Sequence, residues 1–273
     1  MGRIRAVAGT ELRIALRNRW ILIATSLMVL FSLALTFAGS APTGALGVDL
    51  LTVSVASMTT LSVYLLPLLA LLMSFDAIAG EIERGGLALL LTYPVSRGEL
   101  LLGKMLAHLG ALLFAVFTGF GIAGAAAWAV GGAGNDSLAA LFRLGWSSVV
   151  LGASFLAIGY ALSSLARSPG AAAGMAIGVW VVFVVLYDLG LLAALVLDDG
   201  GGFSRQVFPW LLAANPADAF RIFNLSAARD VALATGLAGA TGALPAWVFP
   251  ASLLAWPLTV LTLARLALTG VEP

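Results

Sequence analysis

The most prominent group of charged residues lies between positions 81 and 104, in the stretch EIERGGLALLLTYPVSRGELLLGK. Glu81, Glu83 and Arg84 precede a short apolar run, residues 87–91, which is too short to cross a membrane. Because acidic residues favour the first turn of a helix, we expect a helix that begins at these acids and continues through the run. Two interpretations stay open. The leucines could dip into a membrane interface, or the helix could dock in a groove of a soluble partner.

A second helix is predicted directly after this stretch. The Tyr93–Pro94 step disfavours helical backbone before the proline and therefore ends the first helix. Ser96 and Glu99 then have the spacing of a capping box, in which the serine caps the new helix and the glutamate reaches back to it. The new helix would lead into a long apolar segment.

Side chains that carry catalysis or bind metals are scarce. The chain has no cysteine and a single histidine, His108, so we expect no catalytic residue, no metal site and no cofactor. The metalloprotease pattern HExxH and the phosphate-binding pattern GxxxxGK[ST] are both absent from the sequence. The net charge of +1 gives no reason to expect nucleic acid as a partner.

Composition indicates that these residues are positioned by membrane helices. The chain of 273 residues is 61% hydrophobic and 10% charged, with a mean hydropathy of +1.06. Its apolar runs are about 20 residues long, enough for a helix to cross a bilayer. We therefore predict an all-α polytopic membrane protein, with residues 1–273 as one transmembrane domain and six spans. The predicted spans are 20–38, 51–75, 105–130, 145–165, 171–197 and 247–268, and the fifth could instead end near Asp188.

The distribution of Lys and Arg predicts the orientation. With a cytoplasmic N-terminus, ten of these residues lie inside and four outside, as the positive-inside rule requires. Both termini and segment 76–104 are then cytoplasmic, in a bacterial inner membrane. Residues 1–19 are expected to form an amphipathic helix that lies in the membrane–water interface, although a disordered basic start remains an alternative. Segment 198–246 is expected to pack on the outer mouth, with a short helix that begins at Asn215 or Pro216.

Two further features concern the fifth span. Gly170, Gly174 and Gly178 form a ridge of small residues, which allows another helix backbone to approach closely. We favour packing within one subunit, with contact across a dimer as the alternative. Asp188 is the acid expected deepest in a span; it could line an outer vestibule or lie at the membrane interface.

The segment SFDAIAGEIERGGLALLLTYPVSRGELLLGK resembles the intracellular segment of ABC-2 type permeases. This resemblance implies a homodimer that works with two copies of a separate ABC ATPase, which hydrolyses ATP. It also implies that five residues seat in a groove of that ATPase: Glu81, Glu83, Arg84, Gly85 and Leu87.

Two other segments, GMAIGVWVVFVVLYDLGLLAAL and NPADAFRIFNLS, resemble one subgroup of this family, the permeases that serve the maturation of nitrous oxide reductase. The subgroup implies a periplasmic accessory protein and a role in copper-site assembly. Alternatives are an ABC-2 permease that exports a lipid, drug or ion, a secondary transporter or channel, and an intramembrane enzyme. The last two are disfavoured because ionisable residues and catalytic pairs within the spans are scarce.

Overall fold

The computed structural model describes residues 2–16, 19–38, 49–86, 89, 92–93, 95–132, 134–198, 201–226 and 244–269. Every regular element in these ranges is helical, which confirms the predicted all-α class. Within the described residues, six helices are long and apolar enough to cross a membrane, as predicted. They are α2 (Arg19–Ala38), α4 (Leu50–Ser74), α7 (Arg97–Gly131), α8 (Asn135–Leu165), the continuous run α9 (Pro169–Trp180), η1 (Val181–Leu186) and α10 (Tyr187–Asp198), and α15 (Val248–Thr269).

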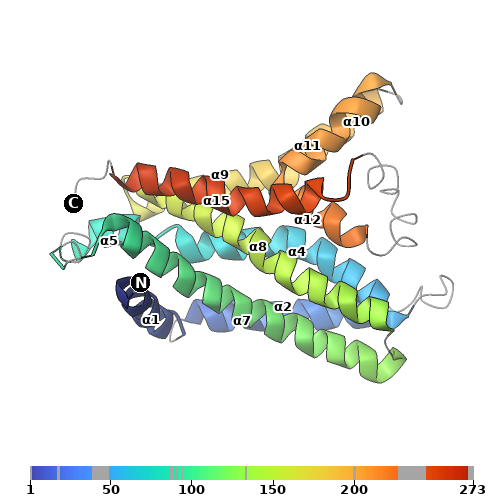
Figure 1. Cartoon of the computed structure of the whole chain (residues 1–273), viewed down its shortest axis with the longest axis horizontal. Coiled ribbons are helices and arrows are strands. Elements are labelled where there is room, and N and C mark those ends of the chain that lie inside the picture. The colour runs from blue at the N-terminus through green and yellow to red at the C-terminus, as the bar shows by residue number, and fades with distance from the viewer. Residues whose placement is uncertain are drawn as a thin grey trace.

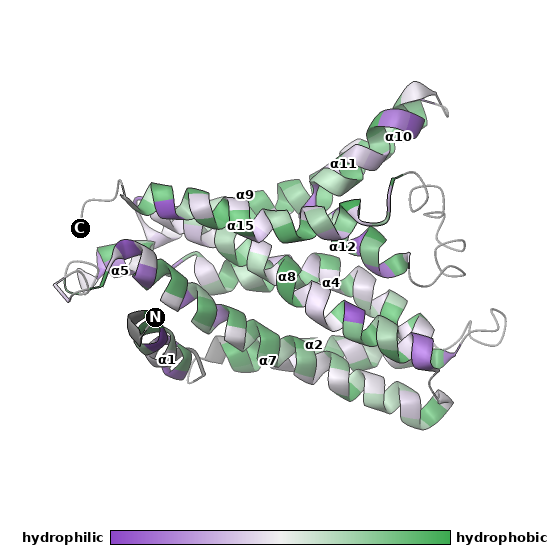
Figure 2. Ribbon diagram, viewed as in Figure 1, coloured by the Kyte–Doolittle hydropathy of each residue, from purple (hydrophilic) through white to green (hydrophobic). Residues whose placement is uncertain are grey.

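Shorter helices lie at both ends of this bundle. At one end, on the left of Figure 1, lie α1 (Gly2–Leu16), α5 (Ala79–Glu83) and the last turn of α15. We call this the α5 end. Towards the opposite end lie η2 (Phe203–Val207), α11 (Phe208–Ala214) and α12 (Pro216–Leu225). Figure 2 shows mainly hydrophobic residues along the long helices, whereas hydrophilic residues gather at α5 and the start of α7.

Helix α8 is central to the bundle, since it packs against α4, α7 and α15. In its most apolar window 72% of the residues are buried, the largest share among the six spans. Its Phe155 and Tyr160 are among the largest fully buried side chains of the core. On one side of this core, α7 packs against both α1 and α2.

The fifth span lies largely outside this core. Only 11% of its most apolar window is buried, although its mean hydropathy of 2.5 is the highest of the six. Residues such as Leu189, Leu192 and Val196 are exposed. The helix continues to Asp198 through a π-helical turn at Val181–Leu186, so it does not end near Asp188.

Helices α7 and α8 begin well before the apolar runs that predicted them. Helix α7 begins at Arg97 because the expected capping box forms: the Glu99 amide donates to the Ser96 side chain, and the Glu99 carboxylate accepts from the Ser96 amide. Helix α8 begins at Asn135, with Asp136 in its first turn, where a negative charge is favourable. The predicted short helix is also confirmed, with Asn215 as the cap of α12.

Contact between α2 and α7 depends on a glycine. A Cβ atom on Gly119 would lie 2.8 Å from Met28 Cβ and 3.0 Å from the Met28 carbonyl carbon, whereas one on Gly121 would meet nothing within 4 Å. We expect Gly119→Ala to destabilise the protein by about 1–3 kcal/mol, because the backbone of α2 must shift. Gly121→Ala, the matched control, should be neutral or slightly stabilising, since alanine favours helix more than glycine does. Thermal unfolding in detergent compares the two, and equal melting temperatures would contradict the expectation.

Candidate functional site: the charged segment between the second and third spans

The charged segment folds differently from the helix expected to begin at its acids. Helix α5 covers Ala79–Glu83 and has Glu81 in its first turn, as expected for an acid, but it ends at Glu83 instead of continuing through the apolar run. The helix ends because Gly85 adopts a φ of +69°, which glycine tolerates and other residues avoid. The acids therefore do mark the start of the helix, whereas the expectation that this helix continues through the apolar run was wrong. In the apolar run, Leu89 is helical and 65% exposed, whereas Leu87 lies outside the described residues.

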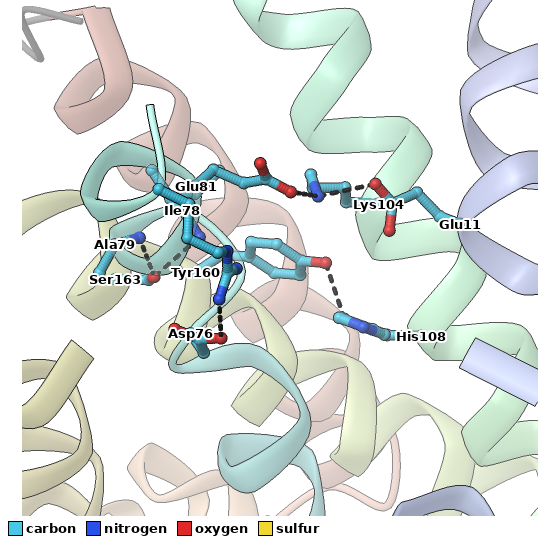
Figure 3. A network of polar contacts seen from close by, with 10 residues as sticks. Glu11, Asp76, Ile78, Ala79, Glu81, Lys104, His108, Tyr160 and Ser163 are labelled. Atoms are coloured by element: carbon cyan, nitrogen blue, oxygen red, sulfur yellow. Dashed lines mark hydrogen bonds and ion pairs between the residues drawn. The ribbon is translucent and has the colours of Figure 1, made fainter. Parts of the chain in front are cut away.

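The start of α5 is fixed to helix α8 by one side chain. The amides of Ile78 and Ala79 both donate to Ser163 Oγ, each at 3.0 Å (Figure 3). The first amides of a helix have no partner within it, and Ser163 supplies that partner from a fully buried position. Ser163 thereby ties the start of α5 to α8.

The second anchor is a buried ion cluster around Lys104. Its Nζ lies 2.7 Å from Glu11 Oε1 of α1 and 3.1 Å from Glu81 Oε1 of α5, as Figure 3 shows. The Lys104 side chain is 5% exposed, so this charge depends on its two partners for solvation. Three elements, α1, α5 and α7, meet at one ammonium group. Glu81 therefore faces Lys104, with 24% of its side chain exposed.

Helix α1 is held against α7 by packing as well as by charge. A Cβ on Gly103 would lie 2.6 Å from Val7 Cγ1, so the two helices approach closely there. Arg5 and Arg13 are exposed on the other side of α1. The amphipathic helix predicted within residues 1–19 is present. Part of its apolar side contacts α7, and its placement in a lipid interface stays a prediction.

The exposed residues of the segment include Glu83, Arg84, Gly85 and Leu89. Arg84 Nη1 lies 3.4 Å from Asp76 Oδ2, but both side chains are exposed, so this pair contributes little to stability. Further along, Arg97 Nη1 donates to the Leu268 carbonyl of α15 at 2.8 Å and joins the start of the third span to the end of the sixth. The site therefore presents an acid, a base and an apolar side chain on an element anchored to several spans.

His108 lies one turn beyond Lys104, where its Nδ1 is 2.8 Å from the Tyr160 hydroxyl and the rings stack (Figure 3). This contact joins α7 to α8. Within the described residues no three His, Cys, Asp or Glu side chains group as metal ligands would.

The two predicted features of the fifth span are also resolved. A Cβ on Gly170, Gly174 or Gly178 would meet no atom within 4 Å. The preferred interpretation, packing within one subunit, is therefore not seen among the described residues, and contact across a dimer stays a prediction. Asp188 Oδ2 lies 2.7 Å from Arg221 Nη2 and joins α10 to α12.

Sequence reasoning missed Glu11, Ser163 and the role of Lys104. A lysine inside an apolar helical run is one available signal, because such a charge requires a buried partner. Ser163 gives no comparable signal, since serines inside membrane helices usually bond to their own backbone.

The ABC-2 family transporter model matches residues 5–269. The chain belongs to this family of membrane proteins, and it is the permease subunit of an ABC transporter. Two curated relatives are each described as a probable ABC transporter permease protein NosY. The one from Pseudomonas aeruginosa is 46% identical over 241 residues, covering 88% of this chain and 87% of the relative. The one from Stutzerimonas stutzeri is 43% identical over 260 residues, covering 94% of each.

Proposed function

We propose that this permease couples a separate ABC ATPase, bound at the α5 end, to a partner on the other side of the membrane. Membership of the family implies an ATPase partner. The observation that carries the proposal is the exposed Glu83–Arg84–Gly85 turn on a helix tied to α8 through Ser163 and to α7 through Lys104. In this arrangement the α5 end faces the cytoplasm of a bacterial cell, and ATP is hydrolysed on the separate subunit.

The mechanism begins when ATP closes two ATPase copies beneath a permease homodimer. Their movement displaces α5. Ser163 transmits the displacement to the fourth span, and Lys104 transmits it to the third span and to α1. Because packed helices switch between discrete arrangements rather than deforming continuously, the bundle then changes the side to which it opens. The exposed glycine ridge of the fifth span is proposed as the dimer contact.

The cellular role that we propose is assembly of the copper site of nitrous oxide reductase, together with a periplasmic accessory protein. Support comes from the NosY relatives and from the resemblance of segments 174–195 and 215–226 to the subgroup with that role. Copper itself is not ligated by this chain in the proposal, because it lacks cysteine and has one histidine. Export of another substrate, such as a lipid, drug or ion, is the second candidate, since ABC-2 permeases share the fold and the coupling segment.

Glu83→Ala combined with Arg84→Ala tests the coupling surface. If the pair is central to the contact, its removal costs more than about 1.4 kcal/mol of binding free energy, so the affinity for the ATPase should fall roughly tenfold or more. Co-purification of the ATPase from gently solubilised membranes measures the binding, and the nitrous oxide reductase activity of cells carrying the variant measures the output. Both should fall.

The matched control is Arg205→Ala combined with Asp136→Ala, which also removes one exposed base and one exposed acid, but towards the opposite end of the bundle. It should bind the ATPase like the wild type. Unchanged co-purification in the Glu83/Arg84 variant would contradict the coupling role. Normal reductase activity in cells that lack the chain would instead point to export of another substrate.

A further inference from the structure

A second buried ion cluster lies away from the coupling segment, between the fifth span and helix α12. Arg221 of α12 bonds Asp188 of α10 through Nη2 at 2.7 Å, and its Nη1 lies 3.2 Å from Asp218 Oδ1. Helix α12 packs against α4, α8, α11 and α15. It therefore fixes one side of this cluster to the core of the bundle, whereas the other side belongs to the sparsely packed α10.

The two carboxylates of the cluster differ in their surroundings. The Asp188 side chain is 28% exposed and makes the shorter contact with Arg221. The Asp218 side chain is 1% exposed, and neither of its oxygens accepts a hydrogen bond of good geometry from the described residues. Its 3.2 Å approach to Arg221 is therefore an electrostatic contact without a bond. Asp218 must share the guanidinium of Arg221 with Asp188 and is shielded from water. Its ionised form is therefore costly in free energy.

No other described group compensates that charge. The Tyr187 hydroxyl of α10 donates to the Leu211 carbonyl, and Arg143 of α8 reaches the Phe223 carbonyl instead. Tyr64 of α4 lies near Arg221. From α15, Ser252 and Trp256 donate to carbonyl groups of α11. The group that does face Asp218 is Asp188, a carboxylate close enough to accept a hydrogen bond from it.

We propose that Asp218 is a proton-binding site, and that its proton holds α10 to α12. With the proton in place, Asp218 is neutral, donates to Asp188 and leaves Arg221 to form its ion pair with Asp188. When the proton leaves for water, through the partly exposed Asp188, two like charges compete for one guanidinium. The Asp188–Arg221 contact weakens, and the outer half of the fifth span is released from the bundle.

The direction of the pH dependence follows from burial. Burial raises the pKa of Asp218 to about 8, opposed by the charge of Arg221 and assisted by the neighbouring Asp188. Because this folded-state pKa lies above the ordinary value of 3.8, the stabilising contribution is complete below the ordinary value. It is lost as the pH rises through the folded-state pKa. The contact should therefore be closed in mild acid and open in base, with a midpoint near pH 8.

The absence of cysteine allows spin labels to be placed at chosen sites. Val196→Cys on α10 and Ser226→Cys at the end of α12 are both exposed positions. Distances between the two labels, measured in the full-length chain in lipid nanodiscs about two pH units below and above the midpoint, report the contact. We expect one short distance at the lower pH and a longer, broader distribution at the higher pH. Infrared spectra should show the carbonyl stretch of a protonated carboxyl at the lower pH.

Three variants decide the outcome. Asp218→Asn, a neutral mimic, should keep the short distance at both pH values and lose the infrared band. Asp188→Asn should give the long distance at both. The control Asp136→Asn, an exposed acid on α8, should behave like the wild type. A wild-type pH response in Asp218→Asn, or persistence of the infrared band there, would overturn the proposal. The proposal would also be overturned if the distance between the labels did not change with pH but changed with added sodium or potassium. That result would identify the cluster as a cation site.

Discussion

Replacement of Lys104 by methionine is expected to destabilise the protein by about 3–5 kcal/mol, because it leaves two buried carboxylates without their cation. Glu11 and Glu81 lie 2.7 and 3.1 Å from the ammonium group, whose side chain is 5% exposed, and the two carboxylates are partly buried. The loss should appear as a lower melting temperature of the purified permease. It should also appear as weaker attachment of α1 and α5, measured by faster hydrogen exchange of both helices.

Two further variants distinguish the effect of the buried charge on stability from its effect on coupling to ATP hydrolysis. Lys104→Arg keeps the cation and should restore most of the stability. The triple variant Lys104→Met, Glu11→Gln, Glu81→Gln removes all three charges, and replacement of a buried ion cluster by neutral groups is often tolerated. Its stability should recover, whereas, under the proposed function, its coupling of ATP hydrolysis to reductase maturation should not. A Lys104→Met variant as stable and as well coupled as the wild type would show that the cluster carries neither role.

Replacement of Ser163 by alanine is expected to detach the start of α5 from α8. Two amides, of Ile78 and Ala79, lose their acceptor at 3.0 Å. A buried polar group left without a partner costs about 1–3 kcal/mol. Hydrogen exchange at these two amides should accelerate by roughly tenfold or more, since each 1.4 kcal/mol corresponds to a factor of ten. Under the proposed function, reductase maturation should fall as well.

The matched control for this experiment is Ser154→Ala on the same helix. Ser154 is equally buried, but its hydroxyl donates only to the Val150 carbonyl of its own helix, so its loss should change little. Ser163→Thr keeps the acceptor oxygen and should retain the wild-type exchange rates. If Ser154→Ala and Ser163→Ala accelerate exchange equally, the bond from α5 to α8 has no special role.

The long helices could be predicted because each rests on a local signal. Apolar runs of membrane length gave the six spans, the Ser96–Glu99 pair gave the start of α7, and the Asn215–Pro216 step gave the start of α12. Signals of this kind involve residues three or four positions apart. Their physical cause, capping or a match to membrane thickness, acts within one element.

The candidate site was predictable in position but not in geometry. The segment around Glu83 and Arg84 was identified from its charge, yet Glu81 turned out to face Lys104. Orientation of a short helix depends on partners such as Ser163, which lies 84 residues from Ala79. Likewise, Asp188 was singled out, whereas its partner Arg221 was not. Contacts between distant residues leave no periodic pattern, so a single sequence does not encode them in a form that can be read locally.

The fourth span, α8, and the fifth span, residues 169–198, differ in hydropathy and burial, and this difference has a consequence for their insertion into the membrane. In its most apolar window, the fourth span has a mean hydropathy of 1.7 and 72% of its residues buried. The fifth span has a mean hydropathy of 2.5 and only 11% of its residues buried. A helix as apolar as the fifth partitions into lipid by itself as it leaves the translocon. The fourth span instead has most of its window buried, against α4, α7 and the later α15. We therefore expect the fifth span to insert independently, and the fourth to reach its final position only when the bundle assembles around it.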